Sequence, residues 1–183
     1  MVVRDRAEAI ALAPLLAGTQ IALEITSSID GFVDLIAETV EAYPTPGVIA
    51  GTITDAETGR AAARAGARAL VSPHVVPDLP KAVDVLTILG ALTPTEVTTA
   101  AAAGAAAVKV FPVSAVGGVS YLRALRGPYP SLPLVPSGGI QPDEIGDYFA
   151  AGAAAVGLGS RSLTRGGDPA AMIEKLSRIL AEA

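Results

Sequence analysis

The sequence predicts an α/β protein, a single (β/α)8 TIM barrel that spans residues 1–183 as one domain. Strand-like and helix-like stretches alternate eight times along the chain, with short turns between them. The strand-like stretches are continuous runs of Val, Ile, Leu and Ala, which are typical of parallel strands covered by helices. The chain has 183 residues, fewer than the roughly 200–250 usual for this fold.

The expected elements follow one another in strict alternation. The strands are expected at 1–4, 20–26, 47–52, 68–72, 84–88, 107–111, 132–136 and 154–158. A helix is expected after each strand, at 5–17, 30–42, 55–65, 77–81, 94–103, 117–126, 142–151 and 168–182. The fourth helix is a single short turn, and Thr93-Pro94-Thr95-Glu96 marks the start of the fifth, where Thr95 and Glu96 are interpreted as capping residues.

An Ala-Gly-Ala motif recurs at 65–67, 103–105 and 151–153, each time between a helix and the next strand. Glycine is favoured just past a helix end because the backbone there is often left-handed. Its recurrence at every second strand-helix unit favours a closed, quasi-symmetric barrel over an open doubly wound sheet. The alternative is that the motif reflects only the Ala and Gly richness of the chain.

Composition excludes several classes of function. The chain has 13 Lys and Arg against 18 Asp and Glu, and no dense basic cluster, which argues against nucleic-acid partners. It has no Cys and one His, so neither a disulfide framework nor a thiolate or imidazole-rich metal site is expected, and no cofactor is predicted. The longest apolar N-terminal stretch is too short to span a bilayer, and we expect a soluble, cytoplasmic protein.

Two isolated charges indicate the active site. Glu24 is the only charged residue in the stretch 9–29, and Lys109 is the only one in the stretch 97–122. Both lie in apolar strands, and alternation places Glu24 and Thr26, and likewise Lys109 and Phe111, on the inner face of a barrel. An unpartnered charge is costly to bury, so the pair indicates either chemistry or a structural ion pair.

The chemistry expected of this pair is nucleophilic attack by an amine, with the acid as a proton shuttle. An amine attacks a carbonyl only in its uncharged form, and an ionised carboxylate in direct contact would oppose that form. We therefore expect Glu24 to lie at a water-bridged distance from Lys109, or to be partly protonated.

Two glycine turns at the ends of the last two strands indicate a phosphate site. They are Pro136-Ser137-Gly138-Gly139-Ile140 and Gly157-Leu158-Gly159-Ser160. The corresponding ends of strands 7 and 8 commonly hold a phosphate in barrels, through backbone N–H groups that glycine leaves accessible. Two further turns, Ala50-Gly51-Thr52 and Ser72-Pro73-His74, end strands 3 and 4. His74 is interpreted as a loop or rim residue rather than a catalytic base.

Taken together, these motifs resemble the 2-keto-3-deoxy-6-phosphogluconate aldolases and the related 4-hydroxy-2-oxoglutarate aldolases. The resemblance covers nearly the whole chain, in order and spacing. The combination of Val108-Lys109-Val110-Phe111-Pro112 with the Gly138-Gly139-Ile140 turn is specific, although neither piece alone would be. The resemblance implies a (β/α)8 barrel, a class I aldolase that needs no metal or cofactor, and a homotrimer.

The resemblance also implies roles for individual residues. Lys109 would form a Schiff base with the keto carbon of a keto-acid substrate, and Glu24 would move protons. The residues that would bind or enclose the pyruvate portion are Gly51, Thr52, Pro73 and Phe111, with Arg4 as a further contact. The residues that would hold the phosphate are Ser137, Gly138, Gly139, Gly159 and Ser160.

The chain departs from the family pattern at several positions. Ser28 stands where the family commonly has an Arg that contributes to carboxylate recognition, and loss of such a charge-assisted contact costs roughly 1.5–3 kcal/mol. Arg4, at a position that is often basic, could compensate. Leu89-Gly90 replaces a Pro-Gly, and Ser137 replaces a Thr. The helix that usually precedes the first strand is missing, so we expect a short form that lacks the N-terminal capping helix.

Two other functions stay open at this point. The same barrel and phosphate site could serve a sugar-phosphate decarboxylase, isomerase or synthase, an alternative that Ser28 supports. The chain could also be a catalytically silent barrel used for binding or assembly. Retention of Glu24, Lys109 and Thr52 together argues against the silent barrel, because an idle site has no physical need for paired charges in an apolar core.

Overall fold

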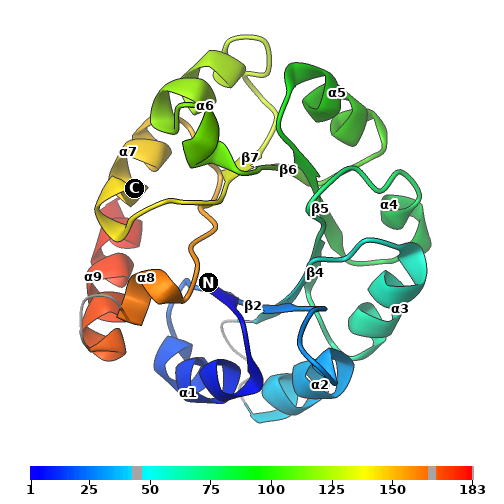
Figure 1. Cartoon of the computed structure of the whole chain (residues 1–183), viewed down its shortest axis with the longest axis vertical. Coiled ribbons are helices and arrows are strands. Elements are labelled where there is room, and N and C mark those ends of the chain that lie inside the picture. Colours follow the sequence, from blue (N-terminus) through cyan, green and yellow to red (C-terminus); the bar gives the residue numbers. More distant parts are fainter. Residues whose placement is uncertain (43–46, 165–167, 183) are drawn as a thin grey trace.

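The computed structural model describes residues 1–42, 47–164 and 168–182, and it shows a curled parallel sheet surrounded by helices (Figure 1). Seven strands pair in chain order, each parallel to the next. They are β1 (Val2–Val3), β2 (Leu23–Thr26), β3 (Val48–Gly51), β4 (Ala69–Val71), β5 (Leu86–Ala91), β6 (Ala107–Val110) and β7 (Leu134–Pro136). The parallel α/β architecture agrees with the sequence prediction.

The eighth predicted strand, 154–158, is instead an extended segment that bridges the two edges of the sheet. On one side Ala154 and Gly157 donate backbone hydrogen bonds to the carbonyls of Leu134 and Pro136, both at 2.9 Å. On the other side the Val2 N–H donates to the Leu158 carbonyl, and the Ser160 N–H donates to the Val2 carbonyl, both at 2.9 Å. Because β1 has only two residues, it offers too short an edge for a regular ladder, and isolated bridges close the sheet.

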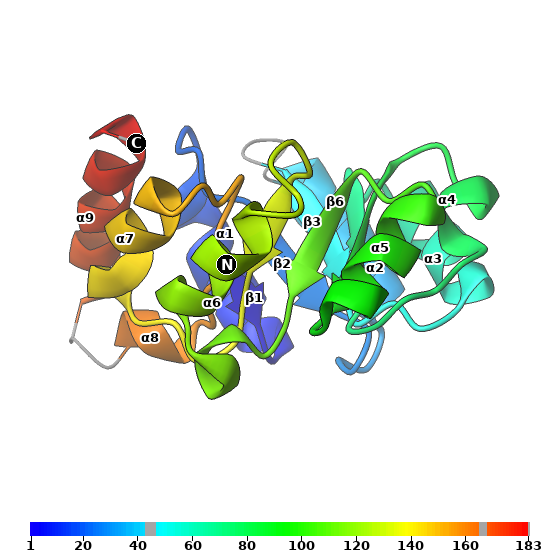
Figure 2. The ribbon, with the colours of Figure 1, turned by 90° about the horizontal axis from the view of Figure 1, so that it is seen from above.

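Helices form a ring outside the sheet, as Figures 1 and 2 show. Those that follow the strands are α1 (Arg6–Leu16), α2 (Phe32–Ala42), α3 (Ala56–Arg64), α4 (Leu79–Ala82), α5 (Pro94–Ala102), α6 (Val119–Arg126), α7 (Ile145–Ala150) and α9 (Pro169–Glu182). Three short helical turns were not predicted as separate elements: η1 (Val113–Val116), η2 (Pro142–Glu144) and α8 (Arg161–Thr164). Each has only three or four residues, too few to show helical periodicity.

The hydrophobic core lies between the sheet and the helix ring. Outward-facing strand residues such as Leu23, Ile25, Val108 and Val110 are almost completely buried against the helices. Their chain neighbours therefore face the barrel interior, since side chains alternate along a strand. This alternation places the side chains of Glu24 and Lys109 in the interior.

Two local predictions needed adjustment. The fifth strand begins two residues later than expected and extends to Ala91, because Gly90 within it allows the backbone of Pro73 to pass where a Cβ atom would lie. The helix that follows is capped by Thr93 rather than Thr95. Thr93 and Glu96 form a capping box, with the Thr93 backbone N–H donating to the Glu96 carboxylate at 2.7 Å.

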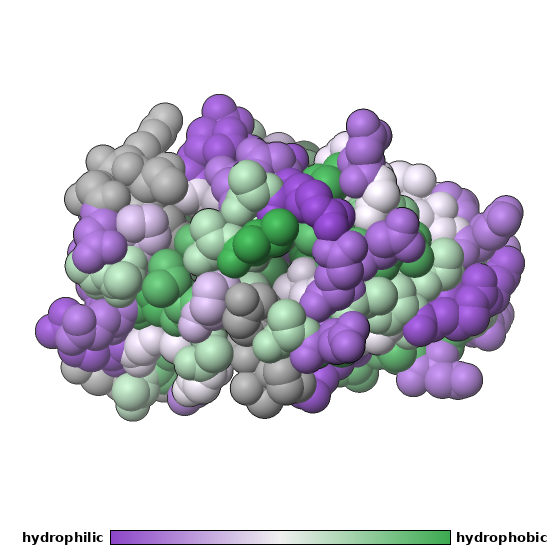
Figure 3. All heavy atoms as spheres, turned by 90° about the horizontal axis from the view of Figure 1, so that it is seen from below, coloured by the Kyte–Doolittle hydropathy of each residue, from purple (hydrophilic) through white to green (hydrophobic). Residues whose placement is uncertain are grey.

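The outer surface carries few large apolar side chains, and two of them lie on α1. Ile10 is 52% exposed and Leu15 is 40% exposed. Figure 3 shows the face on the α1 and α2 side of the molecule, where hydrophobic residues gather near the middle and hydrophilic residues lie mainly above them and toward both sides. Among the described residues, none of the helices combines the length and apolar character required to cross a membrane.

Candidate active site

Two cavities meet inside the barrel. The mouth pocket, of about 430 Å³, lies at the carboxyl ends of the strands. The lower cavity, of about 520 Å³, lies toward their amino ends and is lined mainly by Ile, Val, Leu and Ala side chains. Both are lined by Glu24, Lys109, Ser137 and Gly157, so these residues lie where the two cavities meet. Active sites of such barrels lie at the carboxyl ends of the strands, which favours the mouth pocket as the substrate site.

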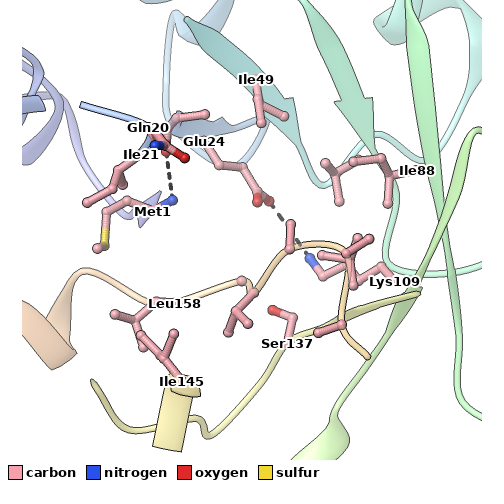
Figure 4. Close-up of a pocket in the computed structure, with 18 of the residues that line it drawn as sticks. Met1, Gln20, Ile21, Glu24, Ile49, Ile88, Lys109, Ser137, Ile145 and Leu158 are labelled. Carbon is pink, nitrogen blue, oxygen red and sulfur yellow. Dashed lines mark hydrogen bonds and ion pairs between the residues drawn. The ribbon is translucent and has the colours of Figure 1, made fainter. Parts of the chain in front are cut away.

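Glu24 and Lys109 face each other across the barrel interior. Lys109 Nζ lies 3.8 Å from Glu24 Oε1, and the two side chains are only 12% and 11% exposed. Figure 4 shows them pointing toward one another from opposite walls of the lower cavity, with Ser137 beside Lys109 and Ile49 and Ile88 nearby. An acid and an amine so placed can exchange a proton directly after a small movement or through one water molecule.

Gly51 provides the space that Glu24 occupies. Gly51 lies on β3 next to β2, and a Cβ atom built on it would lie 2.3 Å from Glu24 Oε1. Any larger residue would push the carboxylate out of its present position. The position of Glu24 therefore explains why position 51 is a glycine, which the sequence alone did not indicate.

An aromatic ring and a proline ring form the wall near Lys109. Phe111 and Pro73 both line the mouth pocket. The Lys109 Nζ atom is 5.2 Å from the centroid of the Phe111 ring, a distance at which a cationic amine is attracted to the ring face. The Phe111 ring also packs on Gly138, where a Cβ atom would lie 2.9 Å from it.

Hydroxyl groups occupy the side of the mouth formed by β2 and β3. Thr26 and Thr52 line the mouth pocket, and the Thr26 hydroxyl lies 2.8 Å from that of Ser28. Thr52 has a φ of 58°, a left-handed conformation that is strained for a β-branched residue. The Ser27 hydroxyl donates to the Thr52 carbonyl at 2.7 Å and helps to hold it. Such strain tends to occur at functional positions.

The first glycine turn lines the opposite side of the mouth. Ser137, Gly138 and Gly139 follow β7 directly, and Gly159 completes this side from the bridging segment. Gly138 and Gly139 have φ values of 93° and 83°, which other residues rarely adopt. The turn thus combines small residues, exposed backbone and a hydroxyl, as an anion site requires.

Ser160 and Arg4 are held outside this pocket by Glu8 of α1. The buried Ser160 hydroxyl donates to Glu8 Oε2 at 2.7 Å, and Arg4 forms an ion pair with Glu8 Oε1 at 2.5 Å. Partial burial raises the pKa of the Glu8 carboxyl, but the hydrogen bonds from Ser160 and Arg4 outweigh this and hold the pKa below its ordinary value. Neither Ser160 nor Arg4 is among the residues that line the mouth.

A family model described as KDPG and KHG aldolase matches residues 1–176 of the chain. The chain belongs to this family. Among curated proteins, the 2-dehydro-3-deoxy-6-phosphogalactonate aldolase of Escherichia coli strain K12 is 36% identical over 144 residues, which are 76% of this chain and 70% of that protein.

Solved structures agree with membership of the KDPG and KHG aldolase family. The native KDPGal structure superposes with a TM-score of 0.86 at 30% identity, over 99% of this chain and 93% of that one. A designed cage, made by fusing symmetric oligomeric domains, superposes with a TM-score of 0.85 at 30% identity, over 99% of this chain and 71% of that one. These likenesses support a fold of the TIM-barrel type.

Sequence reasoning missed three polar residues that line the mouth in this member of the KDPG and KHG aldolase family. They are Gln141, Arg161 and Ser162. Arg161 directly follows the Gly159-Ser160 turn, and a cation next to a predicted phosphate turn was the available signal. His74 is exposed in the loop after β4 and does not line the mouth, in agreement with a loop position.

Proposed function

We propose that the protein is a class I aldolase that forms a Schiff base through Lys109. It would reversibly cleave a 2-keto-3-deoxy (phospho)sugar acid or a 4-hydroxy-2-oxo acid to pyruvate and an aldehyde such as glyceraldehyde 3-phosphate. The single observation that carries this proposal is the Glu24 and Lys109 pair, 3.8 Å apart and nearly buried, at the base of the mouth pocket in a chain of this family.

The first half of the reaction joins the enzyme to its substrate. The uncharged Lys109 amine attacks the keto carbon and gives a carbinolamine, in which nitrogen and hydroxyl share one carbon. Glu24 donates a proton to the departing hydroxyl, water leaves, and a protonated imine remains. Glu24 is well placed for this step because its carboxylate faces the Nζ atom across the interior.

The second half breaks the carbon–carbon bond. As the C4 hydroxyl loses its proton to a base, the electrons of the C3–C4 bond move into the protonated imine, so that an enamine forms and the aldehyde leaves. Protonation of the enamine at C3 and hydrolysis of the imine then release pyruvate and restore Lys109. The imine lowers the barrier because the carbanion left by cleavage is delocalised onto nitrogen.

The residues around the pair would bind the two ends of the substrate. Gly51 and Thr52 would contact the pyruvate portion through backbone and hydroxyl groups, and Pro73 and Phe111 would enclose it. Ser137, Gly138, Gly139 and Gly159 would hold a phosphate at the other end. All of these residues except Gly51 line the mouth pocket, and that position supports their roles. Ser160 and Arg4 are bonded to Glu8, so we assign them to holding the 157–160 segment in place.

Trapping the imine tests the proposal. Incubation with pyruvate and borohydride should add a stable mass to Lys109 and to neither Lys81 nor Lys175, which are exposed on α4 and α9 and are the other two lysines of the chain. A Lys109→Arg variant should take up no label and show no cleavage. Label on Lys81 or Lys175 with Lys109 unmodified would refute the assignment.

The other sequence hypotheses have less support. The matching family model and the curated relative are both described as aldolases, which disfavours a decarboxylase, isomerase or synthase. Turnover of a non-keto-acid phosphate, in the absence of label on Lys109, would favour that alternative instead.

We also propose that the protein assembles as a homotrimer in the cytoplasm. Exposed Ile10 and Leu15 on α1 support self-association, because such apolar surface is stabilised when another subunit covers it. The cage-forming structural relative is built from oligomeric domains, which also supports an oligomer. Light scattering after size-exclusion chromatography should give three times the 18.3 kDa of one chain, and a monomer would overturn this proposal.

A further inference from the structure

The lower cavity takes no part in the proposed cleavage of a sugar acid, which uses the mouth pocket. Its volume of about 520 Å³ lies within the roughly 300–1,000 Å³ that is typical of small-molecule sites. The interior of a TIM-type barrel is ordinarily filled by layers of strand side chains. Here the inward-facing side chains of Ile49, Ile88 and Val135 are only partly buried, so they leave a space below Lys109 instead of closing it.

The wall of the lower cavity is apolar almost throughout. Figure 4 shows Ile49 and Ile88 on one side, with Ile145 and Leu158 across the cavity from Ile49. The alanine run at 153–155 and aliphatic side chains of α9 also line it. Such a wall holds water poorly, because a buried water molecule needs about two to four polar partners. It favours instead a ligand that can bury a hydrocarbon chain.

The cavity is reactive at one end and reaches solvent at another. Among its described lining residues, Glu24 and Lys109 carry the only charged side chains, and both lie where the lower cavity meets the mouth pocket. A carboxylate head group would be repelled by Glu24, whereas a neutral carbonyl group would not, and the Lys109 amine can attack it. Toward the amino ends of the strands, the exposed residues Gln20, Ala154 and Ala155 line the cavity. A ligand can therefore enter from this end with its carbonyl group foremost.

We propose that the lower cavity is a second carbonyl-binding site, which takes neutral aliphatic aldehydes and presents them to Lys109 from the side opposite the mouth. A proton passes from the Lys109 ammonium to Glu24, and the freed amine attacks the carbonyl carbon. The carbonyl oxygen takes this proton and one from the nitrogen and leaves as water, so that a protonated imine remains. This inference goes beyond the proposed aldolase activity and shares with it only the reactivity of Lys109.

Reductive trapping with aldehydes of increasing length tests the second site. Cyanoborohydride reduces the imine to a stable secondary amine, and the mass added to Lys109 is measured against the concentration of acetaldehyde, butanal or hexanal. Each further buried CH₂ should raise the apparent affinity about fourfold, so hexanal should half-label Lys109 at about a hundredth of the acetaldehyde concentration or less. Lys81 and Lys175 are exposed and line neither cavity, so their labelling should show no such dependence on length.

Variants that fill the lower cavity should remove this preference for length. Ala22 lines only the lower cavity, and Ala22→Leu places a larger side chain in it. The ratio of hexanal affinity to acetaldehyde affinity at Lys109 should then fall about tenfold or more. Ile88→Phe fills the same cavity from β5 and should lower the ratio in the same way. Ala124→Leu, exposed on α6 and outside both cavities, is the matched control and should keep the ratio of the unmodified protein.

The outcomes separate this proposal from the aldolase. Equal half-labelling concentrations of acetaldehyde and hexanal at Lys109, or a ratio unchanged in both Ala22→Leu and Ile88→Phe, would overturn the second site. If pyruvate labels Lys109 and the preference for length is absent, the aldolase stands and the second site fails. If hexanal is preferred at Lys109 and pyruvate gives no label, the second site stands and the aldolase fails. If neither compound labels Lys109, both fail.

Discussion

Glu24 and Lys109 lie 3.8 Å apart although they come from strands that are not neighbours in the sheet. Glu24 is on β2 and Lys109 is on β6, with three strands between them. They meet only because the sheet curls on itself and both side chains point inward. Their separation is longer than a hydrogen bond, which leaves the amine able to reach a substrate carbon while the acid stays near.

Glu24→Gln should separate proton transfer from imine formation by Lys109. The amide keeps the shape of the side chain but can neither accept nor donate the catalytic proton. We expect kcat for cleavage to fall by about a hundredfold to ten-thousandfold. Label from pyruvate and borohydride should still reach Lys109, but more slowly. Glu174→Gln, on the exposed surface of α9, serves as the control, and an unchanged kcat in Glu24→Gln would rule out the proton-shuttle role.

Gly51→Ala should displace the Glu24 carboxylate while leaving its chemical identity unchanged. The added Cβ would lie 2.3 Å from Glu24 Oε1, so the carboxylate must shift away from its present place. We expect kcat to fall about tenfold or more, with a smaller change in KM. Gly146→Ala is the matched control because no atom lies within 4 Å of a Cβ there, and it should leave kcat unchanged. Equal kinetics in the two variants would show that Gly51 does not position Glu24.

Thr52→Gly and Thr52→Ala should separate backbone strain from binding. Both remove the hydroxyl, so both should raise the KM of the keto acid to a similar extent. Only glycine adopts the φ of 58° without strain, so Thr52→Gly should have a free energy of unfolding about 1 kcal/mol higher than Thr52→Ala. Denaturant unfolding measures the free energy of unfolding, and steady-state kinetics measure the KM of the keto acid. A Thr52→Ala protein as stable as Thr52→Gly would contradict the strain argument.

Glu8 should make the contact between the 157–160 segment and the β1 end of the sheet sensitive to acid. Its pKa in the folded protein lies below the ordinary value of 4.5, so the ionised form stabilises the fold above that pH, and this contribution is lost as the pH falls through the folded pKa. The free energy of unfolding of the natural protein should therefore exceed that of Glu8→Gln at pH 6–8, and the difference should shrink below about pH 4. A difference independent of pH would exclude the ionised carboxylate as its cause.

Much of the architecture follows from local patterns. Alternation of apolar runs with helical stretches placed seven strands close to their observed positions, because the runs are short and rich in Val, Ile, Leu and Ala. The same alternation assigned Glu24 and Lys109 to the interior. The fifth strand was misplaced at its ends because Gly90 and Thr87 interrupt the apolar run, and a glycine needed for close approach has no local signature.

Other features depend on contacts between distant parts of the chain. The Ser160 hydroxyl, predicted to contact a phosphate, donates to Glu8, 152 residues earlier, a contact that the sequence did not indicate. Arg161 lines the mouth from a four-residue helix that is too short to show periodicity. Bridges through Val2 close the sheet where a full eighth strand was expected.

The sequence alone therefore determined the class of fold, the direction in which each strand side chain points and the two charges able to do chemistry. The physical reason is that strand periodicity and the cost of burying a charge act locally and are visible in the residues themselves. The tertiary structure alone decided which polar groups remain available to a ligand, because a hydroxyl or guanidinium bonds to whichever partner the closed barrel brings within reach. The pairing of Ser160 and Arg4 with Glu8 arises in this way.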